Sequence, residues 1–450
     1  MTIIMRPEFD LYVLARILFA RVLLLLATAA YALSLIYCLD MYAGVKWPQY
    51  GFSFRPMSAS DAILLGFSIF IWCLVLPLKI DRPSSLFLIV IFTFVCVPAA
   101  VSMVSIKDAK DGYFYPLLIS LGIGFFVACI MVRCFSWSSV SREVSNGLVY
   151  MLALMWLFAI AFLIYSFGEV IRFSGLHEIY VQRVRGAAGS LFEGYVQTYF
   201  GYFLSPALLV FGMARRSLLL KMMGGGGAVV LYMITAEKAA LMYPVFIIVF
   251  YFVFSRMSLF LYSAAIAFFF SFILFFSVLF CDDLSLAEFV SWYLGVRSLL
   301  IPGTFVAHYF SYFSDQGFTA LSHITGMSVF VSPPDQLATH PRWPSIGYLV
   351  GEDYFGIPTL NANANFIAWD GVASFGELGV LLSLLFFALF LIVLDWSARG
   401  ISSLVSVVML VPLALTLTNG SLFTAMVSFG GAAFLMIFFL AKKKFPDRTS

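Results

Sequence analysis

Long apolar runs separated by short polar breaks follow one another along most of the chain. Each run comes close to the roughly 20 mostly apolar residues that a helix needs to cross a hydrocarbon core of about 30 Å. The runs are continuously apolar and do not alternate, which favours helices over membrane strands. We therefore predict twelve transmembrane helices, near residues 17–37, 61–78, 85–105, 114–132, 147–167, 195–214, 218–235, 240–255, 258–280, 373–394, 401–418 and 421–440.

The composition supports the same class. Apolar and aromatic residues make up 62% of the 450 residues and charged residues only 11%, whereas a soluble globular domain carries roughly 25% charged residues. With 51 phenylalanines, the chain is also unlike a disordered or collagen-like sequence. We expect an all-α polytopic integral membrane protein, with residues 1–450 forming a single transmembrane domain.

The basic residues predict the orientation of the helices. The net charge of +3 is too small to indicate a nucleic-acid partner. With the amino terminus in the cytoplasm, the inner connections are short and basic, as the positive-inside rule requires. Arg21 is an exception, because it lies about one turn inside the first predicted helix, and we expect its side chain to snorkel to the inner interface. The first helix is expected to be an anchor, and both termini are expected to be cytoplasmic. The inner basic residues are Lys79, Arg82, Arg133, Arg142, Arg215, Arg216, Lys221, Arg256, Arg399, Lys442 to Lys444 and Arg448.

Two long outer segments interrupt the pattern of tight turns. They are residues 168–194 and residues 282–372, the latter between the ninth and tenth predicted helices. Long loops in a compact fold usually bind or catalyse. The longer segment contains helix-like apolar pieces, so we expect a lid or re-entrant subdomain on the membrane face. All four histidines fall in these segments: His177, His308, His323 and His340.

Motifs for metals and cofactors are absent from the sequence. The histidines and cysteines show no metal-ligand spacing, and the sequence contains no P-loop, no G-x-S-x-G and no dinucleotide-binding fingerprint. No outer Asp-x-Asp is spaced to hold a divalent cation. We therefore expect neither a metal nor a cofactor.

Basic residues at the outer surface are candidates for binding phosphate. Arg183 and Arg185 precede Gly186 in the first outer loop, Lys238 lies in a short turn, and Arg297 lies within an apolar and aromatic stretch. A guanidinium matches phosphate oxygens in a bidentate fashion and stays charged. These four residues are a predicted clamp for a lipid-linked pyrophosphate. The alternative is interfacial anchoring, with Glu193 or Glu237 as salt-bridge partners.

The second outer loop combines aromatic rings with amides and small polar groups. Aromatic faces stack on the C–H faces of sugars, while polar side chains bond the hydroxyl rim. This composition favours a carbohydrate ligand, although aromatics at a membrane face also form interfacial belts. The predicted sugar-binding residues are His308, Tyr309, Arg342, Tyr354, Asn361, Asn363 and Asn365.

Several motifs resemble a known family. The main ones are Gly351-Glu-Asp-Tyr-Phe-Gly356, Asn361-Ala-Asn-Ala-Asn-Phe366 and Trp369-Asp-Gly-Val-Ala-Ser-Phe-Gly-Glu-Leu-Gly379. They are similar to the segment that enters a late span of the O-antigen and exopolysaccharide repeat-unit polymerases, the Wzy family. Thr235 to Pro244 and Arg297 to His323 also resemble parts of that family, so that the likeness covers about residues 180–380.

The resemblance implies a bacterial inner-membrane glycosyltransferase that joins polyprenyl-pyrophosphate-linked repeat units without a metal. Its implied partners are the lipid-linked donor and acceptor, membrane lipid and a chain-length regulator protein. Such a reaction needs a base for the acceptor hydroxyl, and His323 is the first candidate because its ordinary pKa lies near working pH. Glu352 and Asp370 are the next candidates. Two other functions stay open: a ligase that transfers polysaccharide to a lipid core, and a flippase or other transporter.

Overall fold

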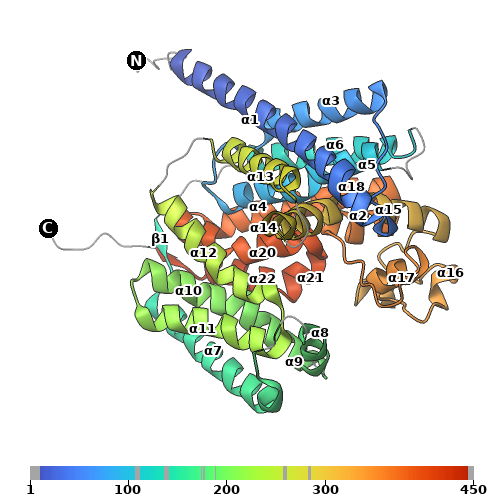
Figure 1. Cartoon of the computed structure of the whole chain (residues 1–450). Helices are drawn as coiled ribbons and strands as arrows, with labels where there is room; N and C mark the ends of the chain where they lie inside the picture. Colours follow the sequence, from blue (N-terminus) through green and yellow to red (C-terminus); the bar gives the residue numbers. More distant parts are fainter. Residues whose placement is uncertain are drawn as a thin grey trace. The chain divides into compact units, whose positions relative to one another are not determined.

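The computed structural model describes residues 11–106, 112–135, 141–173, 175, 178–187, 189–256, 261–281 and 285–443. Within these ranges the regular structure is helical apart from two short strands, β1 (Arg142–Glu143) and β2 (Lys442–Lys443), which pair antiparallel (Figure 1). The predicted class, an all-α polytopic membrane protein, is confirmed.

The described residues form two compact units. Unit 1 takes its residues from 1–79, 88–130 and 259–386, and unit 2 from 80–87, 131–258 and 387–450. Three helices contain a boundary between the units: α4 (Pro83–Ile91), α6 (Tyr115–Cys134) and α18 (Ala373–Ala398). Unit 1 contains α1 (Leu11–Cys38), η1 (Leu39–Ala43), α2 (Gly44–Lys46), η2 (Pro48–Tyr50), α3 (Ala59–Val75), η3 (Phe92–Cys96), α5 (Val97–Ser105), α13 (Tyr262–Leu279), α14 (Leu286–Val290), η6 (Ser291–Leu300), α15 (Ile301–Gln316), η7 (Met327–Val329), α16 (Asp335–Ala338), α17 (Ile346–Asp353) and η8 (Ile367–Val372). Unit 2 contains α7 (Asn146–Phe167), η4 (Gly168–Val170), α8 (Ile179–Arg185), α9 (Leu191–Tyr199), η5 (Phe200–Leu204), α10 (Ser205–Ala214), α11 (Leu218–Thr235), α12 (Lys238–Arg256), α19 (Ser403–Met409), α20 (Val411–Thr416), η9 (Leu417–Asn419), α21 (Leu422–Val427) and α22 (Gly431–Phe439), together with the two strands.

Ten helical stretches in the described part of the chain are long and apolar enough to cross a membrane. Nine of them coincide with predicted transmembrane helices, and two further predicted helices correspond to the shorter apolar stretches Ala59–Val75 and Ser403–Asn419. The protein is therefore a multi-pass membrane protein. The ten stretches are Tyr12–Lys46, Pro83–Ser105, Tyr115–Cys134, Asn146–Val170, Leu191–Ala214, Leu218–Thr235, Lys238–Arg256, Tyr262–Leu279, Leu286–Gln316 and Ile367–Ala398.

Two regions differ in detail from the expected pattern. The stretch Leu286–Gln316, which we expected inside the second outer loop, forms one continuous helical stretch as long as a membrane span. The expected twelfth helix consists instead of the short helices α21 and α22. The interruption falls at Gly430, whose φ of +85° favours glycine and whose Cα lies against the Phe203 side chain. The total number of spans and the placement of 282–372 outside the membrane remain predictions.

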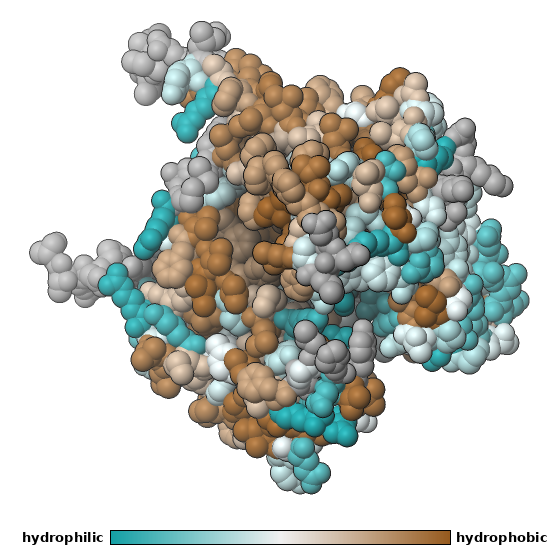
Figure 2. All heavy atoms as spheres, viewed as in Figure 1, coloured by the Kyte–Doolittle hydropathy of each residue, from teal (hydrophilic) through white to brown (hydrophobic). Residues whose placement is uncertain are grey.

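Apolar side chains cover much of the helical surface. Along α7, for example, Phe158 is 69% and Tyr165 89% exposed. Figure 2 shows such apolar residues over α1 and α12, whereas hydrophilic residues gather around α16 and α17. Exposed apolar area of this extent indicates a lipid-facing surface.

Arg21 meets the carboxyl end of a neighbouring helix in unit 1. Its Nη1 donates to the carbonyl oxygens of Cys73, at 2.7 Å, and Leu76, at 2.6 Å, where α3 ends. These carbonyls lack helical partners and carry the negative end of the helix dipole. The charge inside the first span is thus stabilised at a helix end.

One end of unit 2 gathers basic segments that the sequence predicted to share the cytoplasmic side. Strands β1 and β2 meet there, and Arg142 donates to the carbonyls of Ser397 and Phe438 at 3.0 and 2.7 Å. It also bonds the carbonyls of Arg399, Phe439 and Ala441. One guanidinium therefore satisfies the carboxyl ends of α18 and α22 together.

Replacing Arg142 by glutamine should destabilise unit 2, because the shorter amide cannot reach all five carbonyls. We expect a loss of roughly 1–3 kcal/mol, the usual effect of removing hydrogen bonds to a charged group, since the Ser397, Phe438 and Ala441 bonds are part-buried. Thermal unfolding in detergent measures it. Arg133→Gln, at an exposed position of α6, is the control and should unfold like the parent chain.

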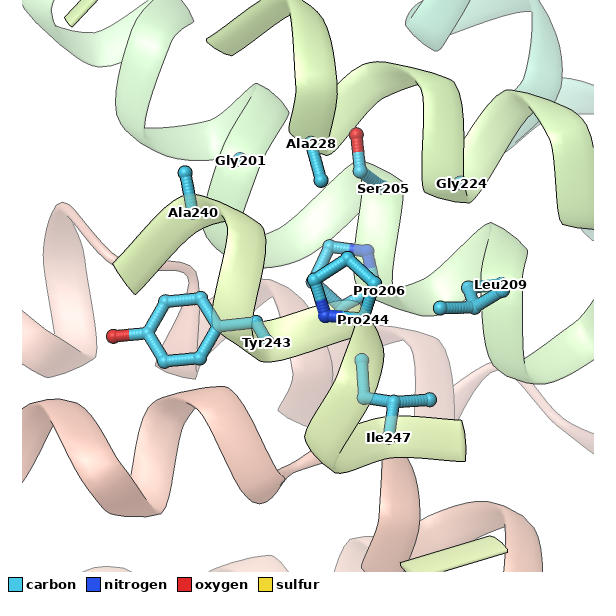
Figure 3. A pocket seen from close by; sticks show the side chains of 10 residues that line it. All are labelled: Gly201, Ser205, Pro206, Leu209, Gly224, Ala228, Ala240, Tyr243, Pro244 and Ile247. Atoms are coloured by element: carbon cyan, nitrogen blue, oxygen red, sulfur yellow. The ribbon is translucent and has the colours of Figure 1, made fainter. Parts of the chain in front are cut away.

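Glycines bring α10 and α11 of unit 2 into close contact. An added Cβ on Gly224 would lie 2.5 Å from the Leu209 backbone nitrogen, and one on Gly227 would lie 2.2 Å from Ser205 Oγ. Beside this contact, α12 leaves a hollow with room for about one water molecule. Figure 3 shows its lining, which is mostly apolar and includes Pro206 and Pro244. This hollow is a packing feature that is too small for a sugar.

Candidate functional site

Three of the predicted phosphate-binding residues lie on neighbouring segments of unit 2. Arg183 and Arg185 lie in the last turn of α8, and Lys238 begins α12 directly after the turn that follows α11. Gly186 contacts the end of α11 so closely that an added Cβ would lie 2.0 Å from the Ile234 carbonyl oxygen. We call Arg183, Arg185 and Lys238 the cationic cluster.

The cationic cluster is accessible. Arg185 is exposed, while Arg183 and Lys238 are half-buried, so that part of each side chain is held by its surroundings. Figure 2 shows hydrophilic and hydrophobic residues side by side around α8 and α9. Cations that reach solvent are suited to binding an anion.

The two carboxylates suggested as anchoring partners have other contacts. Glu193 forms a capping box at the start of α9, where its side chain accepts the backbone N–H groups of Gly189 and Ser190. Glu237 accepts the hydroxyl of Tyr202 at 3.0 Å. Both carboxylates are therefore engaged in holding local backbone or a neighbouring helix.

Arg297, the fourth predicted phosphate ligand, belongs to unit 1. It lies on the π-helical segment η6, its side chain is exposed, and it forms no hydrogen bond or ion pair with any residue in the described part of the chain. The adjoining α14 is tied to α2 by the Lys46–Glu288 ion pair at 2.7 Å. The role of Arg297 in binding phosphate remains a prediction, and it is separate from the cationic cluster.

A polar network joins three pieces of residues 282–372 in unit 1. Tyr312 donates to Asp353 Oδ2 at 2.7 Å, and His340 Nε2 lies 3.1 Å from Asp353 Oδ1. Arg342 Nε donates to Glu352 Oε2 at 2.8 Å. The network fixes the end of α17 against α15 and the segment before α17. Asp353 is not among the predicted site residues, although it stands between Glu352 and Tyr354 in the motif that begins at Gly351.

His308 is an internal residue of α15. It is completely buried, and its Nδ1 lies 3.2 Å from the hydroxyl of Tyr354. Its ring also packs on Gly51, where φ is +77° and an added Cβ would lie 2.3 Å from the imidazole. His308 therefore cannot touch a sugar in this conformation, whereas the half-buried Tyr354 can.

Tyr309 and Asn365 are likewise buried within the fold. The Tyr309 hydroxyl donates to the Ala362 carbonyl at 2.8 Å, and Asn365 Nδ2 donates to the Pro302 carbonyl at 2.6 Å. Asn365 Oδ1 also accepts the backbone N–H of Ile367 at the start of η8. In this conformation, both side chains hold backbone segments together and are not available to a ligand.

The other two asparagines are more open. Asn361 is exposed and Asn363 half-buried. Their side-chain oxygens and the ring of Trp369 surround Gly347, where an added Cβ would lie 2.3 to 3.2 Å from each. Gly347 is buried and fills the space between these three groups, so only the parts of them that reach solvent are open to a sugar.

His323, the first candidate base, is 6% exposed. Its Nδ1 lies 2.7 Å from Thr319 Oγ1, and Nε2 has no hydrogen-bond partner among the described residues. Burial lowers the pKa of His323 to about 4, with a smaller opposing effect from the Trp369 backbone. The imidazole is thus neutral at physiological pH, and a substrate reaches Nε2 only if neighbouring side chains move.

The other two candidate bases differ in exposure. Glu352 is half-buried and paired with Arg342, whereas Asp370 is 5% exposed within η8. The helix that follows Asp370 is broken at Phe375 and Gly376, where Gly376 has a φ of 58° and a ψ of −132°. Gly376 therefore allows a sharp change of direction near the start of α18.

Comparison of the chain with protein-family models, with curated proteins and with solved structures found no match. His177 and the Asp282-Asp283 pair lie outside the described residues. The function therefore has to be argued from the residues themselves.

Proposed function

We propose that this protein is a glycosyltransferase of the bacterial inner membrane, which joins polyprenyl-pyrophosphate-linked oligosaccharide repeat units into a surface polysaccharide such as O-antigen. The sugar's anomeric carbon would leave the pyrophosphate of one lipid and bond to a hydroxyl oxygen of the repeat unit on another. The acceptor proton would pass to a base on the protein. No metal is required, because arginine can neutralise the departing pyrophosphate.

The observation that carries the proposal is the cationic cluster. Arg183, Arg185 and Lys238 come from separate stretches of sequence, yet the contact of Gly186 with the end of α11 brings their backbones to one place. A pyrophosphate group presents several charged oxygens close together, which matches several fixed cations. The lipid anchor of such a substrate fits a protein whose helices face lipid.

Unit 1 supplies the surface suited to sugars. Asn361, Asn363 and Trp369 face Gly347, and Arg342 lies over the Tyr348 ring with its guanidinium carbon 5.8 Å from the centroid. We assign sugar contact to this open part of the second outer loop. His323, Glu352 and Asp370 remain candidate bases, in that order.

Two other functions, a ligase and a transporter, are compared with the proposed one. A ligase would share the phosphate chemistry and differ in its acceptor, so that only the product distinguishes it. A transporter would concentrate charges in a cavity near the middle of its spans. Arg21, Asp61 and Asp395 instead pair with groups at helix ends, since Asp61 caps α3 and Asp395 accepts from Ser84 at the start of α4. This distribution supports an enzyme.

Deleting the protein in its native cell tests the proposal. A polymerase mutant should still export lipid-linked units. Its surface lipid should then carry single repeat units and lack chains of several repeats. A ligase mutant would accumulate long chains on polyprenyl pyrophosphate, and a flippase mutant would accumulate single units on the cytoplasmic face. Either of those two results would replace the proposed function.

The proposed orientation makes a separate prediction. In a background with both Cys134→Ser and Cys281→Ser, a cysteine at exposed Asn361 should react with a membrane-impermeant maleimide in spheroplasts, and one at exposed Glu143 should react only after lysis. This follows from placing the basic end of unit 2 in the cytoplasm. Labelling of Glu143→Cys without labelling of Asn361→Cys in intact spheroplasts would invert the assignment.

A further inference from the structure

A single buried amide lies where three segments of unit 2 meet. The side chain of Gln182 is 0% exposed. Its Nε2 donates to the carbonyl oxygens of Val170 at 2.7 Å, Met233 at 2.9 Å and Ile234 at 3.1 Å. Its Oε1 accepts from Arg172 Nε at 3.1 Å.

These bonds attach a short helix to its neighbours. α8 has seven residues, and isolated helices of that length are unstable in water. Met233 and Ile234 belong to the last turn of α11, whose carbonyls have no partners within the helix. The Gln182 amide donates to both carbonyls, of which the Met233 carbonyl also accepts the backbone N–H of Arg172, and it attaches α8 to α11. Gln197 adds one bond to the backbone of Gly186, at 3.0 Å.

The position of Gln182 in the chain connects this attachment to the cationic cluster. It immediately precedes Arg183, and Arg185 follows within the same turn. Its Oε1 also orients Arg172, whose Nη2 lies 3.3 Å from Glu178 Oε2. The amide thus sets the positions of two guanidinium-bearing segments while contacting no solvent.

We infer that Gln182 is a positioning residue, which holds Arg183 and Arg185 where they bind the pyrophosphate of the lipid-linked substrate. The inference rests on the proposed function for the nature of the anion. The mechanical part, that Gln182 docks α8 on α11, stands on the hydrogen bonds alone. Bidentate recognition of phosphate depends on the orientation of the guanidinium plane, so a displaced α8 weakens binding without removing a charge.

The test uses the full chain in lipid nanodiscs and two variants of Gln182. Gln182→Leu keeps most of the volume and removes all four bonds. Gln182→Glu keeps an acceptor for Arg172 but removes both donors to the carbonyls. Arg142→Gln is the matched control, because it destabilises the other end of unit 2, about 33 Å away along the 22 residues of α7. Arg183→Gln removes a proposed ligand directly.

Two quantities are measured for each protein: binding of inorganic pyrophosphate by calorimetry, and amide hydrogen exchange across α8. We expect both Gln182 variants to bind pyrophosphate roughly 10-fold more weakly, as when one charge-assisted hydrogen bond is lost. Exchange in α8 should rise in the same variants. Arg142→Gln should bind like the parent chain despite its lower melting temperature.

The outcomes separate the inference from the proposed function. Unchanged pyrophosphate binding and unchanged α8 exchange in Gln182→Leu would overturn the positioning role, provided that Arg183→Gln weakens binding. Faster α8 exchange together with equal binding by the parent, Gln182→Leu and Arg183→Gln would show that α8 is docked as described but does not bind this anion. That second result would remove the phosphate assignment and with it the positioning of a phosphate ligand.

Discussion

Replacing Arg183 by lysine is expected to remove most of the polymer while leaving the protein in the membrane at normal abundance. Lysine keeps the charge but loses the planar fork that binds two phosphate oxygens at once. We expect a loss of about 10- to 100-fold in catalytic efficiency, which corresponds to one charge-assisted hydrogen bond of about 1.5–3 kcal/mol. Polymer length and amount on gels, normalised to protein in the membrane, measure the effect.

The matched control is Arg215→Lys. Arg215 is an exposed arginine at the other end of unit 2, where it bonds Asn146 Oδ1 at 2.6 Å and the Val144 carbonyl. This variant should make normal polymer. Arg297→Lys tests the predicted phosphate ligand of unit 1 in the same way, since Arg297 is exposed. Normal polymer from both Arg183→Lys and Arg297→Lys would favour interfacial anchoring over phosphate binding.

Replacing His323 by alanine is expected to lower the rate of polymerisation by roughly 10²- to 10⁴-fold, the usual contribution of a general base. Binding of the lipid-linked donor should change little. The measurement is single-turnover extension of purified lipid-linked repeat units. Glu352→Gln is the comparison, because it removes a charge that pairs with Arg342 while keeping the shape of the side chain. A large loss with Glu352→Gln alone would move the base to that carboxylate.

The pH dependence adds an independent check on the base. Burial lowers the pKa of His323 to about 4, so the neutral form that accepts a proton dominates above that pH. Activity that depends on His323 should therefore persist at pH 5.5 and fall only as the pH approaches 4. A fall centred near 6.5, the ordinary value for histidine, would show that the active conformation exposes the ring to solvent.

The helices could be predicted from the sequence because their signal is long and uniform. Nine of the ten long apolar helices in the described ranges coincide with expected spans. The stretch Leu286–Gln316 is harder to predict as a span, although it contains helix-like apolar pieces, because Arg297 and several polar residues interrupt its apolar pattern. In the structure Arg297 is exposed, and no local rule distinguishes that arrangement from a loop on the membrane face.

The candidate site was only partly predictable, because burial depends on contacts between distant segments. His308, Tyr309 and Asn365 have the polar groups expected of sugar ligands, yet the fold encloses them completely. Asn361, in the same motif as Asn365, is exposed. Gln182 was overlooked because a lone glutamine among apolar residues gives no signal until its three carbonyl partners are known.

Reconstitution of the purified protein with a chemically defined lipid-linked repeat unit tests the central claim most directly. Proteoliposomes that contain only this protein and the polyprenyl-pyrophosphate-linked unit should produce a ladder of products, each longer by one repeat, and should do so equally with and without a chelator. A substrate that stays one repeat long, although the folded protein binds it, would contradict the assignment as a polymerase. A ladder that disappears on adding chelator would contradict the metal-independent mechanism.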